Sequence, residues 1–277
     1  LLPDLREAEA VEVAALYSLS GLLSCDGSLD RRPPLRAPHH SASLEGMIGG
    51  GRPPRPGEIS LAHRGVLFLD EASEFRTDVL QSLREPLEEG KVSLVRAASV
   101  ARFPADFQLI LAANPCPCGN LGRKGKACLC SSQDILRHRR KMGGPLLDRI
   151  DIRIPVEPTA VRELMGPAGE SSAAIRDRVE KAVRLQEERY SGLSLSLNAR
   201  LRPAQVDAFC RLDGAAARAF ERAVGRLSLS SRACHSVLKI ARTIADLDGL
   251  DDIGEDQVLE AIQHRRFGDG DEAWPER

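Results

Sequence analysis

The chain has 277 residues, of which 42% are hydrophobic and 29% charged, as is typical of a soluble globular protein with one large domain or two ordinary ones. No stretch reaches the ~18 uncharged apolar residues that a membrane-spanning helix needs, which argues against a membrane protein. The 39 Lys and Arg residues nearly balance the 40 Asp and Glu residues. Any contact with nucleic acid must therefore come from local basic patches.

The N-terminal part of the chain predicts one helix followed by irregular structure. Residues 4–23 are rich in Ala and Glu, with apolar side chains at three- and four-residue spacing, which favours an amphipathic helix. Its predicted buried face consists of Ala8, Val11, Ala15, Leu19 and Leu22. Residues 26–57 contain too much Pro and Gly for continuous regular structure. Within them, 'HHSASLEGMIGGG' predicts a short helix that ends at the glycines.

Two apolar runs predict buried strands of a parallel sheet. The first is 'GVLFLD' (residues 65–70), and the second is 'FQLILAANP' (residues 107–115), which ends at an Asn-Pro pair. Between them, residues 77–88 predict a helix that stops at Gly90. The apolar face of this helix consists of Val79, Leu80, Leu83 and Leu87. Residues 91–103 predict a hairpin with 'RAAS' at its tip.

Beyond residue 158 the composition changes to helix-forming residues without strong strand signals. Pro203 suits a first helical position and Ser230 suits an N-cap. The predicted helices span residues 172–190, 203–212, 214–227, 230–247 and 255–266. We therefore predict an α/β domain in residues 1–157, followed by an all-helical domain in residues 158–277.

Acidic and polar side chains follow both predicted strands. Asp70 and Glu71 end the first strand, where one acid can hold Mg²⁺ and its neighbour can activate water, although both acids also suit the start of a helix. Asn114 ends the second strand at the same sheet edge and can contact a γ-phosphate or the attacking water. Arg149 follows a short apolar turn, and Arg232 opens a helix. Either Arg alone could be a surface ion pair, but the four elements in this order favour nucleotide hydrolysis.

Four of the seven Cys residues fall within fifteen residues. Cys116, Cys118, Cys128 and Cys130 could form a tetrahedral thiolate site for Zn²⁺. The C-x-C spacing is tighter than the usual zinc motif, so reduced thiols without a metal remain the alternative. Cys25, Cys210 and Cys234 stand alone, which is typical of buried thiols in a reducing, cytoplasmic compartment.

Basic residues cluster in the same loop. Arg123, Lys124 and Lys126 are followed by the 'RHRRK' run of residues 137–141, which favours either a solvated charged surface or phosphate binding. His39 and His40 are adjacent, so they do not converge easily on one metal ion. Aromatic residues make up only 4% of the chain, which argues against binding of single strands through base stacking.

Several long strings resemble the magnesium-chelatase-like AAA+ ATPases, and among them the ComM/YifB competence-related proteins. The matching strings are 'RAPHHSASLEGMIGGG', 'PGEISLAHRGVLFLDE', 'LREPLEEGKVSLVRA', 'NPCPCGN', 'GPLLDRID' and 'SSRACHSVLKIARTIADL'. They are distributed across almost the whole of residues 1–157 and extend into the helical part. The resemblance implies an AAA+ P-loop-type α/β core followed by a helical lid domain.

The resemblance also implies roles for individual residues. Asp70 and Glu71 look like the Walker B pair and Asn114 like the first sensor. Arg149 looks like the arginine finger and Arg232 like the second sensor. The hairpin of residues 91–103 looks like the pore-lining pre-sensor hairpin, whose tip residue Arg96 would contact DNA phosphate. The basic loop at Arg123, Lys124 and Lys126 is the rival candidate for this contact.

The family resemblance implies a ring-forming motor, with ATP and Mg²⁺ as cofactors, a hexamer of identical subunits, and DNA as the partner in branch migration during natural transformation and recombination. Two alternatives remain open: a magnesium-chelatase-like motor that acts on a protein partner, and a non-catalytic fragment. No G-x-x-x-x-G-K-[ST] motif occurs in the sequence. We therefore expect a C-terminal fragment that lacks the Walker A loop and binds ATP poorly on its own.

Overall fold

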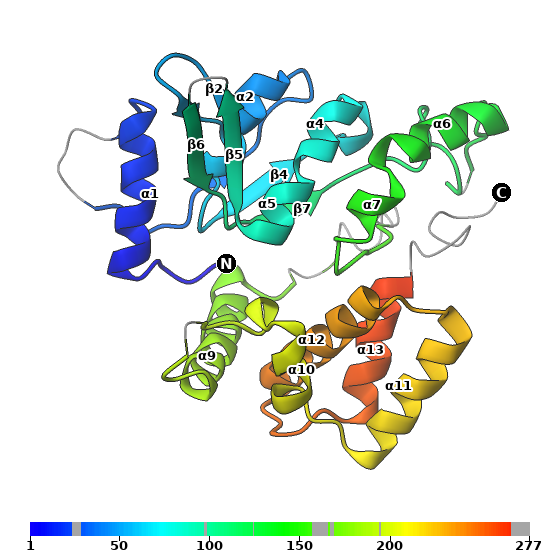
Figure 1. Ribbon diagram of the computed structural model, residues 1–277. Helices are drawn as coiled ribbons and strands as arrows, with labels where there is room; N and C mark the ends of the chain where they lie inside the picture. The colour runs from blue at the N-terminus through cyan, green and yellow to red at the C-terminus, as the bar shows by residue number, and fades with distance from the viewer. Residues whose placement is uncertain are drawn as a thin grey trace. The chain divides into compact units, whose positions relative to one another are not determined.

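The structure is a computed structural model that describes residues 1–23, 29–96, 99–123, 125–156, 166, 169–193 and 195–266. The chain divides into two units. One is Pro3–Arg149, and the other combines Leu1–Leu2 with Ile150–Arg277. The sequence-based boundary at residue 157 lies outside the described residues and stays a prediction. Figure 1 shows both units as ribbons.

A parallel sheet forms the centre of the Pro3–Arg149 unit. Strands β1 (Leu35–Arg36), β4 (Val66–Leu69) and β7 (Gln108–Leu111) lie in the order β1-β4-β7. Both neighbouring pairs are parallel, and Leu69 is opposite Leu111 in the register. Leu67 and Leu69 are fully buried in the core. The predicted α/β core with a parallel sheet is thus confirmed.

Strand β7 is less buried than the sequence predicts. Gln108 is exposed, and the side chain of Ile110 is 42% exposed. In the described sheet β7 pairs with β4 alone. An edge strand leaves part of its surface uncovered, so an apolar run is not enough to predict burial on both faces.

Helix α1 (Glu7–Leu19) confirms the first predicted helix, but its predicted buried face is wrong. Val11 and Leu19 are exposed, whereas Ala10 and Leu16 are buried. The Ala-rich sequence is apolar on several sides, so spacing alone does not select the face. Contacts of Glu12 orient the helix instead: its carboxylate lies 3.1 Å from His63 Nε2, within hydrogen-bond distance, and forms an ion pair with Arg64 at 3.0 Å.

Short elements connect β1 to β4 and confirm the predicted helix before the glycines. Helix α2 (Leu44–Ile48) begins at the N-cap Ser43 and ends at Gly49, whose φ is +102°. Strands β2 (Gly49–Gly50) and β3 (Arg55–Pro56) form an antiparallel pair that precedes helix α3 (Glu58–Leu61). A Cβ at position 49 would lie 2.3 Å from the Arg55 carbonyl oxygen, so this close approach requires glycine.

The single helix predicted for residues 77–88 is two short helices. A 3₁₀ turn, η1 (Ala72–Glu74), precedes α4 (Thr77–Ser82) and α5 (Arg84–Glu89). Pro86 has no N–H to continue the helical hydrogen bonds, which accounts for the break near Leu83. The predicted buried face is confirmed for Val79, Leu80 and Leu83, and Gly90 ends α5 with a positive φ.

The predicted hairpin is confirmed as β5 (Lys91–Arg96) and β6 (Ser99–Pro104), which pair in antiparallel register from Lys91 opposite Pro104 to Arg96 opposite Ser99. Val92, Leu94 and Phe103 are buried against the core. Val95 is 75% exposed on the other side. Residues 97–98 and the side chains of residues 96–99 are outside the described part of the structure.

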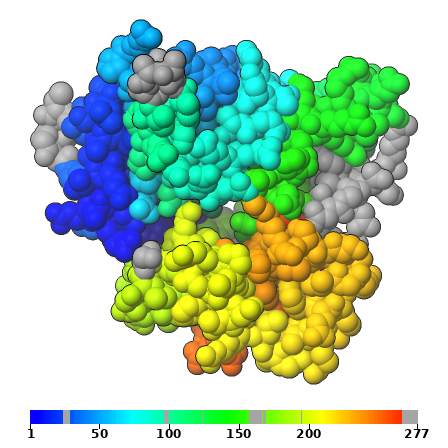
Figure 2. All heavy atoms as spheres, in the orientation of Figure 1, coloured from blue at the N-terminus to red at the C-terminus, as the bar shows by residue number. Residues whose placement is uncertain are grey.

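The Pro3–Arg149 unit ends with two helices that were not predicted from the sequence. Helix α6 (Ser132–Met142) begins at the N-cap Ser131, and α7 (Gly144–Leu147) is the predicted apolar turn before Arg149. Helix α6 buries Ile135, His138 and Met142 and ends with three basic residues. Figure 2 shows the residues around α6 in green at the outer surface of the unit, with α1 in blue at its other side.

The second unit is helical and confirms the predicted elements closely. Ser230 caps α12, and Pro203 is the first residue of α10. The helices are α9 (Ser172–Arg189), α10 (Pro203–Phe209), α11 (Gly214–Leu227), α12 (Ser231–Asp248) and α13 (Glu255–Arg266), with the 3₁₀ turn η2 (Asn198–Arg200). Leu201, Val206, Val237 and Val258 are among the buried core residues.

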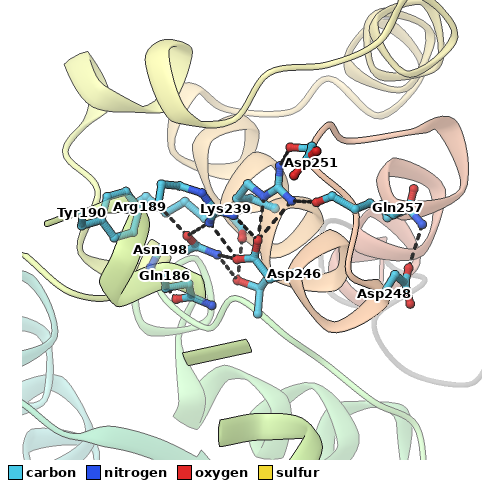
Figure 3. A network of polar contacts seen from close by, with 12 residues as sticks. Gln186, Arg189, Tyr190, Asn198, Lys239, Asp246, Asp248, Asp251 and Gln257 are labelled. Carbon is cyan, nitrogen blue, oxygen red and sulfur yellow. Dashed lines mark hydrogen bonds and ion pairs between the residues drawn. The ribbon is translucent and has the colours of Figure 1, made fainter. Parts of the chain in front are cut away.

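A buried polar network joins α9, η2 and α12 in this unit (Figure 3). The fully buried Asp246 carboxylate accepts hydrogen bonds from both terminal guanidinium nitrogens of Arg189, at 2.5 and 3.0 Å. It also accepts from Asn198 Nδ2 at 2.8 Å and from Arg242 Nε at 3.1 Å. The hydrogen bond to Asp246 raises the pKa of Arg189. The network therefore fixes one arrangement of these helices.

Candidate functional site

Asp70 and Glu71 follow β4 directly at the carboxyl edge of the sheet. Main-chain pairing with the β7 segment continues on both sides of them, because the N–H of Ala112 donates to Leu69 at 3.0 Å and the N–H of Ala72 donates to Ala112 at 2.8 Å. Both acidic residues are exposed. The carboxyl edge of a parallel sheet is where α/β folds bind ligands, so these carboxylates are accessible to one.

Glu71 has a left-handed backbone conformation, with a φ of +48°. This conformation costs a non-glycine residue roughly 1–2 kcal/mol, and it persists where surrounding interactions determine it. Here the N–H of Glu71 donates to the Asp70 carboxylate at 2.8 Å. The next residue, Ala72, is held by its main-chain hydrogen bond to Ala112. The two acidic side chains therefore leave the strand at a fixed point.

His40 lies beside Glu71, which the sequence analysis did not anticipate. Its Nδ1 is 3.3 Å from Glu71 Oε2, and its ring stacks on His39 with 4.0 Å between the centroids. The residue follows β1, and parallel pairing brings the ends of β1 and β4 to the same edge. The imidazole can hydrogen-bond the carboxylate and fix its orientation.

Asn114 follows β7 at the same edge, three residues after Leu111, and is exposed. Its carbonyl oxygen accepts a hydrogen bond from Nε2 of His138, at 3.0 Å. His138 is on α6, with its side chain only 4% exposed, and its Nδ1 lies 3.9 Å from Glu74. Asn114 and the acidic pair therefore follow the ends of two neighbouring strands, and α6 holds the Asn114 backbone.

Arg149 lies at the end of the same unit, directly after α7. Its guanidinium forms an ion pair with Glu88 of α5 and donates to the Pro145 carbonyl oxygen. The side chain is 12% exposed. A guanidinium held this way contacts its own unit and would have to leave Glu88 to reach a ligand elsewhere.

Arg232 belongs to the helical unit, where it is the second residue of α12 and is exposed. Ser230 caps this helix by accepting a hydrogen bond from the N–H of Ala233 at 3.2 Å. Arg232 therefore lies in the first turn of a well-defined helix.

The four clustered cysteines lie close together in the loop between β7 and α6. Sulfur atoms of Cys116, Cys118 and Cys128 are separated by 3.5 to 3.7 Å, and all four sulfurs lie within 4.8 Å of one another. A tetrahedron of sulfurs at ~2.3 Å from a central Zn²⁺ has edges of about 3.8 Å. A disulfide would bring two sulfurs to about 2.05 Å. The cluster matches a tetrathiolate metal site in ligand type and spacing.

Proton affinities within the cluster differ widely. The backbone N–H of Asn120 lowers the pKa of Cys118 to about 6. For Cys130, a backbone hydrogen bond from Cys118 lowers the pKa, but desolvation and the neighbouring thiols outweigh it and raise the pKa to about 12. Adjacent thiolates repel one another, and a bound cation removes this repulsion. Within the described residues, this is the one cluster of at least three such ligands that could hold a metal.

Basic residues surround this loop. Arg123 and Lys126 are exposed, whereas Lys124 lies outside the described residues, as does the side chain of Arg96. The basic end of α6 follows, with Arg139, Arg140 and Lys141 in its last turn. The loop therefore presents positive charge next to the strand edge that carries Asn114.

Comparisons with known proteins agree with this fold. The α/β sheet, the polar strand ends and the helical second unit define an AAA+-like protein. Residues 1–164 match the family described as magnesium chelatase, subunit ChlI, and residues 169–265 match the family described as its C-terminal part. The chain belongs to this magnesium chelatase family.

Competence protein ComM of Haemophilus influenzae is 42% identical over 268 residues, which is 96% of this chain and 51% of that protein. The uncharacterized protein YifB of Escherichia coli is 43% identical over 267 residues, again 96% of this chain and 51% of the relative. An uncharacterized protein of Mycobacterium bovis is 40% identical over 269 residues, or 97% and 53%. The chain thus spans about half the length of these relatives. In the part that the structure describes, no helix is both long and apolar enough to cross a membrane.

Proposed function

We propose that the full-length protein hydrolyses ATP at the sheet edge that carries Asp70, Glu71 and Asn114. The supporting observation is that two carboxylates and one amide side chain follow neighbouring parallel strands, β4 and β7, at their carboxyl ends. Carboxylate oxygens are the ligands that Mg²⁺ prefers, so the chemistry of Asp70 fits this ion, directly or through water. When bound, Mg²⁺ neutralises charge on the phosphates.

In this proposal Glu71 orients and deprotonates the attacking water, and His40 positions the Glu71 carboxylate through the contact at 3.3 Å. Asn114 hydrogen-bonds the γ-phosphate or the same water. His138 holds the Asn114 backbone at 3.0 Å, so α6 fixes the main chain from which this amide extends. Arg232 acts as the second sensor, from the helical lid.

Arg149 acts on the nucleotide of a neighbouring subunit, in a homo-oligomer that we propose is a hexameric ring. The role requires exchange of partners, because the guanidinium pairs with Glu88 in the isolated chain. Transition-state charge on the γ-phosphate would replace the Glu88 carboxylate as the partner of Arg149.

We further propose that ATP hydrolysis drives DNA remodelling of the branch-migration or helicase type, in the cytoplasm. Support comes from 42% identity to a relative named a competence protein and from the exposed basic residues near the site. Arg96 at the hairpin tip and the loop residues Arg123, Lys124 and Lys126 would contact phosphate. The family description also favours a second candidate, a motor subunit that acts on a protein partner in metal insertion.

DNA-stimulated ATPase activity of the full-length protein separates these functions. Stimulation by DNA supports remodelling, whereas stimulation only by a protein partner supports the second candidate. Arg96→Ala should weaken DNA binding across sequences and lower the salt slope by about one unit per subunit engaged, with the unstimulated ATPase near normal. The matched control is Arg123→Ala/Lys126→Ala. If Arg96→Ala binds DNA like wild type while the control fails, the hairpin assignment is wrong.

The cysteine cluster completes the proposed set of cofactors, with a structural Zn²⁺ beside ATP and Mg²⁺. Four sulfur ligands with near-tetrahedral spacing are typical of structural zinc. Metal analysis of the purified protein tests this directly.

A further inference from the structure

The loop that carries Asn114 also carries all four clustered cysteines. Between the end of β7 and the start of α6 it runs for residues 112–131, without a helix or strand among its described residues. Cys116 lies two residues after Asn114, and Cys130 lies two residues before α6. Loops longer than about 12–15 residues without regular structure are uncommon in compact domains and are often functional. Interactions other than helix or strand hydrogen bonds must therefore order this loop.

The cysteine cluster is built into the unit on one side. Cys116 is fully buried and packs with Leu121 and with Ile135 of α6. The N–H of Leu121 donates to the Cys116 sulfur at 3.4 Å. Hydrogen bonds of this kind orient metal ligands and are often essential to affinity. The sulfur nearest to Asn114 in sequence is therefore also the one most firmly held.

Helix α6 connects the cluster back to Asn114. The helix starts two residues after Cys130, and its His138 donates to the Asn114 carbonyl oxygen at 3.0 Å. A fixed point at Cys116 on one side and at α6 on the other leaves Asn114 little freedom. Without an ion, weak sulfur contacts of 3.5 to 3.7 Å join Cys116, Cys118 and Cys128, and the Cys130 sulfur lies within 4.8 Å of these three.

We propose that Cys116, Cys118, Cys128 and Cys130 bind one Zn²⁺ whose role is to position Asn114 against the nucleotide. This proposal rests on the ATPase function proposed above. The metal closes the loop, ties it to the start of α6 and so fixes the strand end from which Asn114 reaches the γ-phosphate. The cysteines are positioning residues, because they touch the metal and not the substrate.

The first test is metal content, which does not depend on catalysis. The full-length protein and the Cys128→Ser and Cys234→Ser variants are purified in parallel and analysed for zinc by mass spectrometry. Cys234 lies in the helical unit and is the matched control. We expect about one zinc per chain in wild type and Cys234→Ser, and a large loss in Cys128→Ser. Cysteines found as disulfides, with no zinc, would overturn the proposal.

The second test asks whether the metal positions Asn114. Hydrogen exchange of residues 112–118 is compared with zinc bound, after chelation, and after zinc is restored. We expect faster exchange on chelation and recovery on restoration, with the helical unit unchanged. Unchanged exchange in this segment would show that the metal does not order the strand end.

The third test separates positioning from general stability. Cys128→Ser should lower kcat by about a hundredfold, the size expected when a catalytic group is misplaced by about 1 Å, with a smaller change in KM. Adding Cys128→Ser to Asn114→Ala should cause little further loss, because both changes remove the same contribution. If the double variant instead loses kcat by the product of the two single losses, the two changes act independently and the link to Asn114 is refuted. If wild type binds zinc but does not turn over ATP, the proposed function fails while the metal and exchange tests still decide this inference.

Discussion

Replacing Asp246 by Ala should destabilise the helical unit severely. The substitution removes a fully buried carboxylate that compensates two guanidinium groups. The side chain of Arg189 is 22% exposed and can be hydrated by water in the variant, so the broken pair with Arg189 contributes little to the expected cost. The side chain of Arg242 is 2% exposed and would keep only carbonyl partners, at Leu250 and Asp251.

The expected cost follows from this uncompensated buried charge. Removing one partner of a buried ion pair costs about 3–5 kcal/mol, a large part of the stability of an ordinary domain. The midpoint of thermal unfolding should fall by roughly 10–20 °C for a unit of this size. Asp246→Asn should cost less, because it keeps one oxygen acceptor in nearly the same shape.

Thermal and urea unfolding, followed by circular dichroism, measure this effect. The control is Asp177→Ala, which removes an exposed pair with Lys181 on α9 and should leave the free energy of unfolding nearly unchanged, because solvent screens this pair. A loss below about 1 kcal/mol for Asp246→Ala would refute the reasoning that Arg242 depends on this carboxylate.

Three further predictions concern the site and the core. Arg149→Ala in the full-length protein should leave ATP binding nearly intact while hydrolysis falls by about 10³; mixing it with Glu71→Gln should restore some turnover, and no rescue at any ratio would argue against a shared site. His40→Ala should lower kcat more than KM, because it releases the Glu71 carboxylate; an unchanged kcat would contradict the positioning role. Burial raises the pKa of Cys210 to about 11 from a usual 9.0, so its thiol ionises first in the unfolded chain. Stability should therefore fall by roughly 2–3 kcal/mol as the pH rises from 9 to 11, and Cys210→Ala should flatten this slope in urea unfolding; an unchanged slope would be the contrary result.

The elements that local pattern determines were predictable from the sequence. Ser230 and Pro203 mark helix starts through caps and fixed φ, and the structure has both where the sequence places them. The 'GVLFLD' run likewise predicts β4, because a short apolar run between Gly and an acidic residue is typical of a buried parallel strand.

The interactions that connect distant segments were not predictable. His138 contacts Asn114 across 24 residues, and His40 reaches Glu71 across 31. Each contact depends on tertiary packing, which the local strings around His40 and His138 do not encode. The buried face of α1 was wrongly predicted for the same reason. Contacts of Glu12 with His63 and Arg64 orient this helix, and the spacing of its own apolar residues does not.

The clustered cysteines were predictable only in part. Their spacing indicated a metal site, but the spacing alone did not exclude reduced thiols without a metal. The sulfur separations near 3.7 Å come from the fold of the loop and favour the tetrahedral arrangement. The link from this cluster through α6 to Asn114 required the structure.

ATP turnover by the Glu71→Gln variant of the full-length protein tests whether this sheet edge is the catalytic site. The matched control is Glu89→Gln, which changes an exposed carboxylate paired with Lys91. We expect Glu71→Gln to lower kcat by about 10² or more while ATP stays bound, and Glu89→Gln to turn over like wild type. Turnover of Glu71→Gln within about twofold of wild type would contradict the assignment of this sheet edge as the catalytic site.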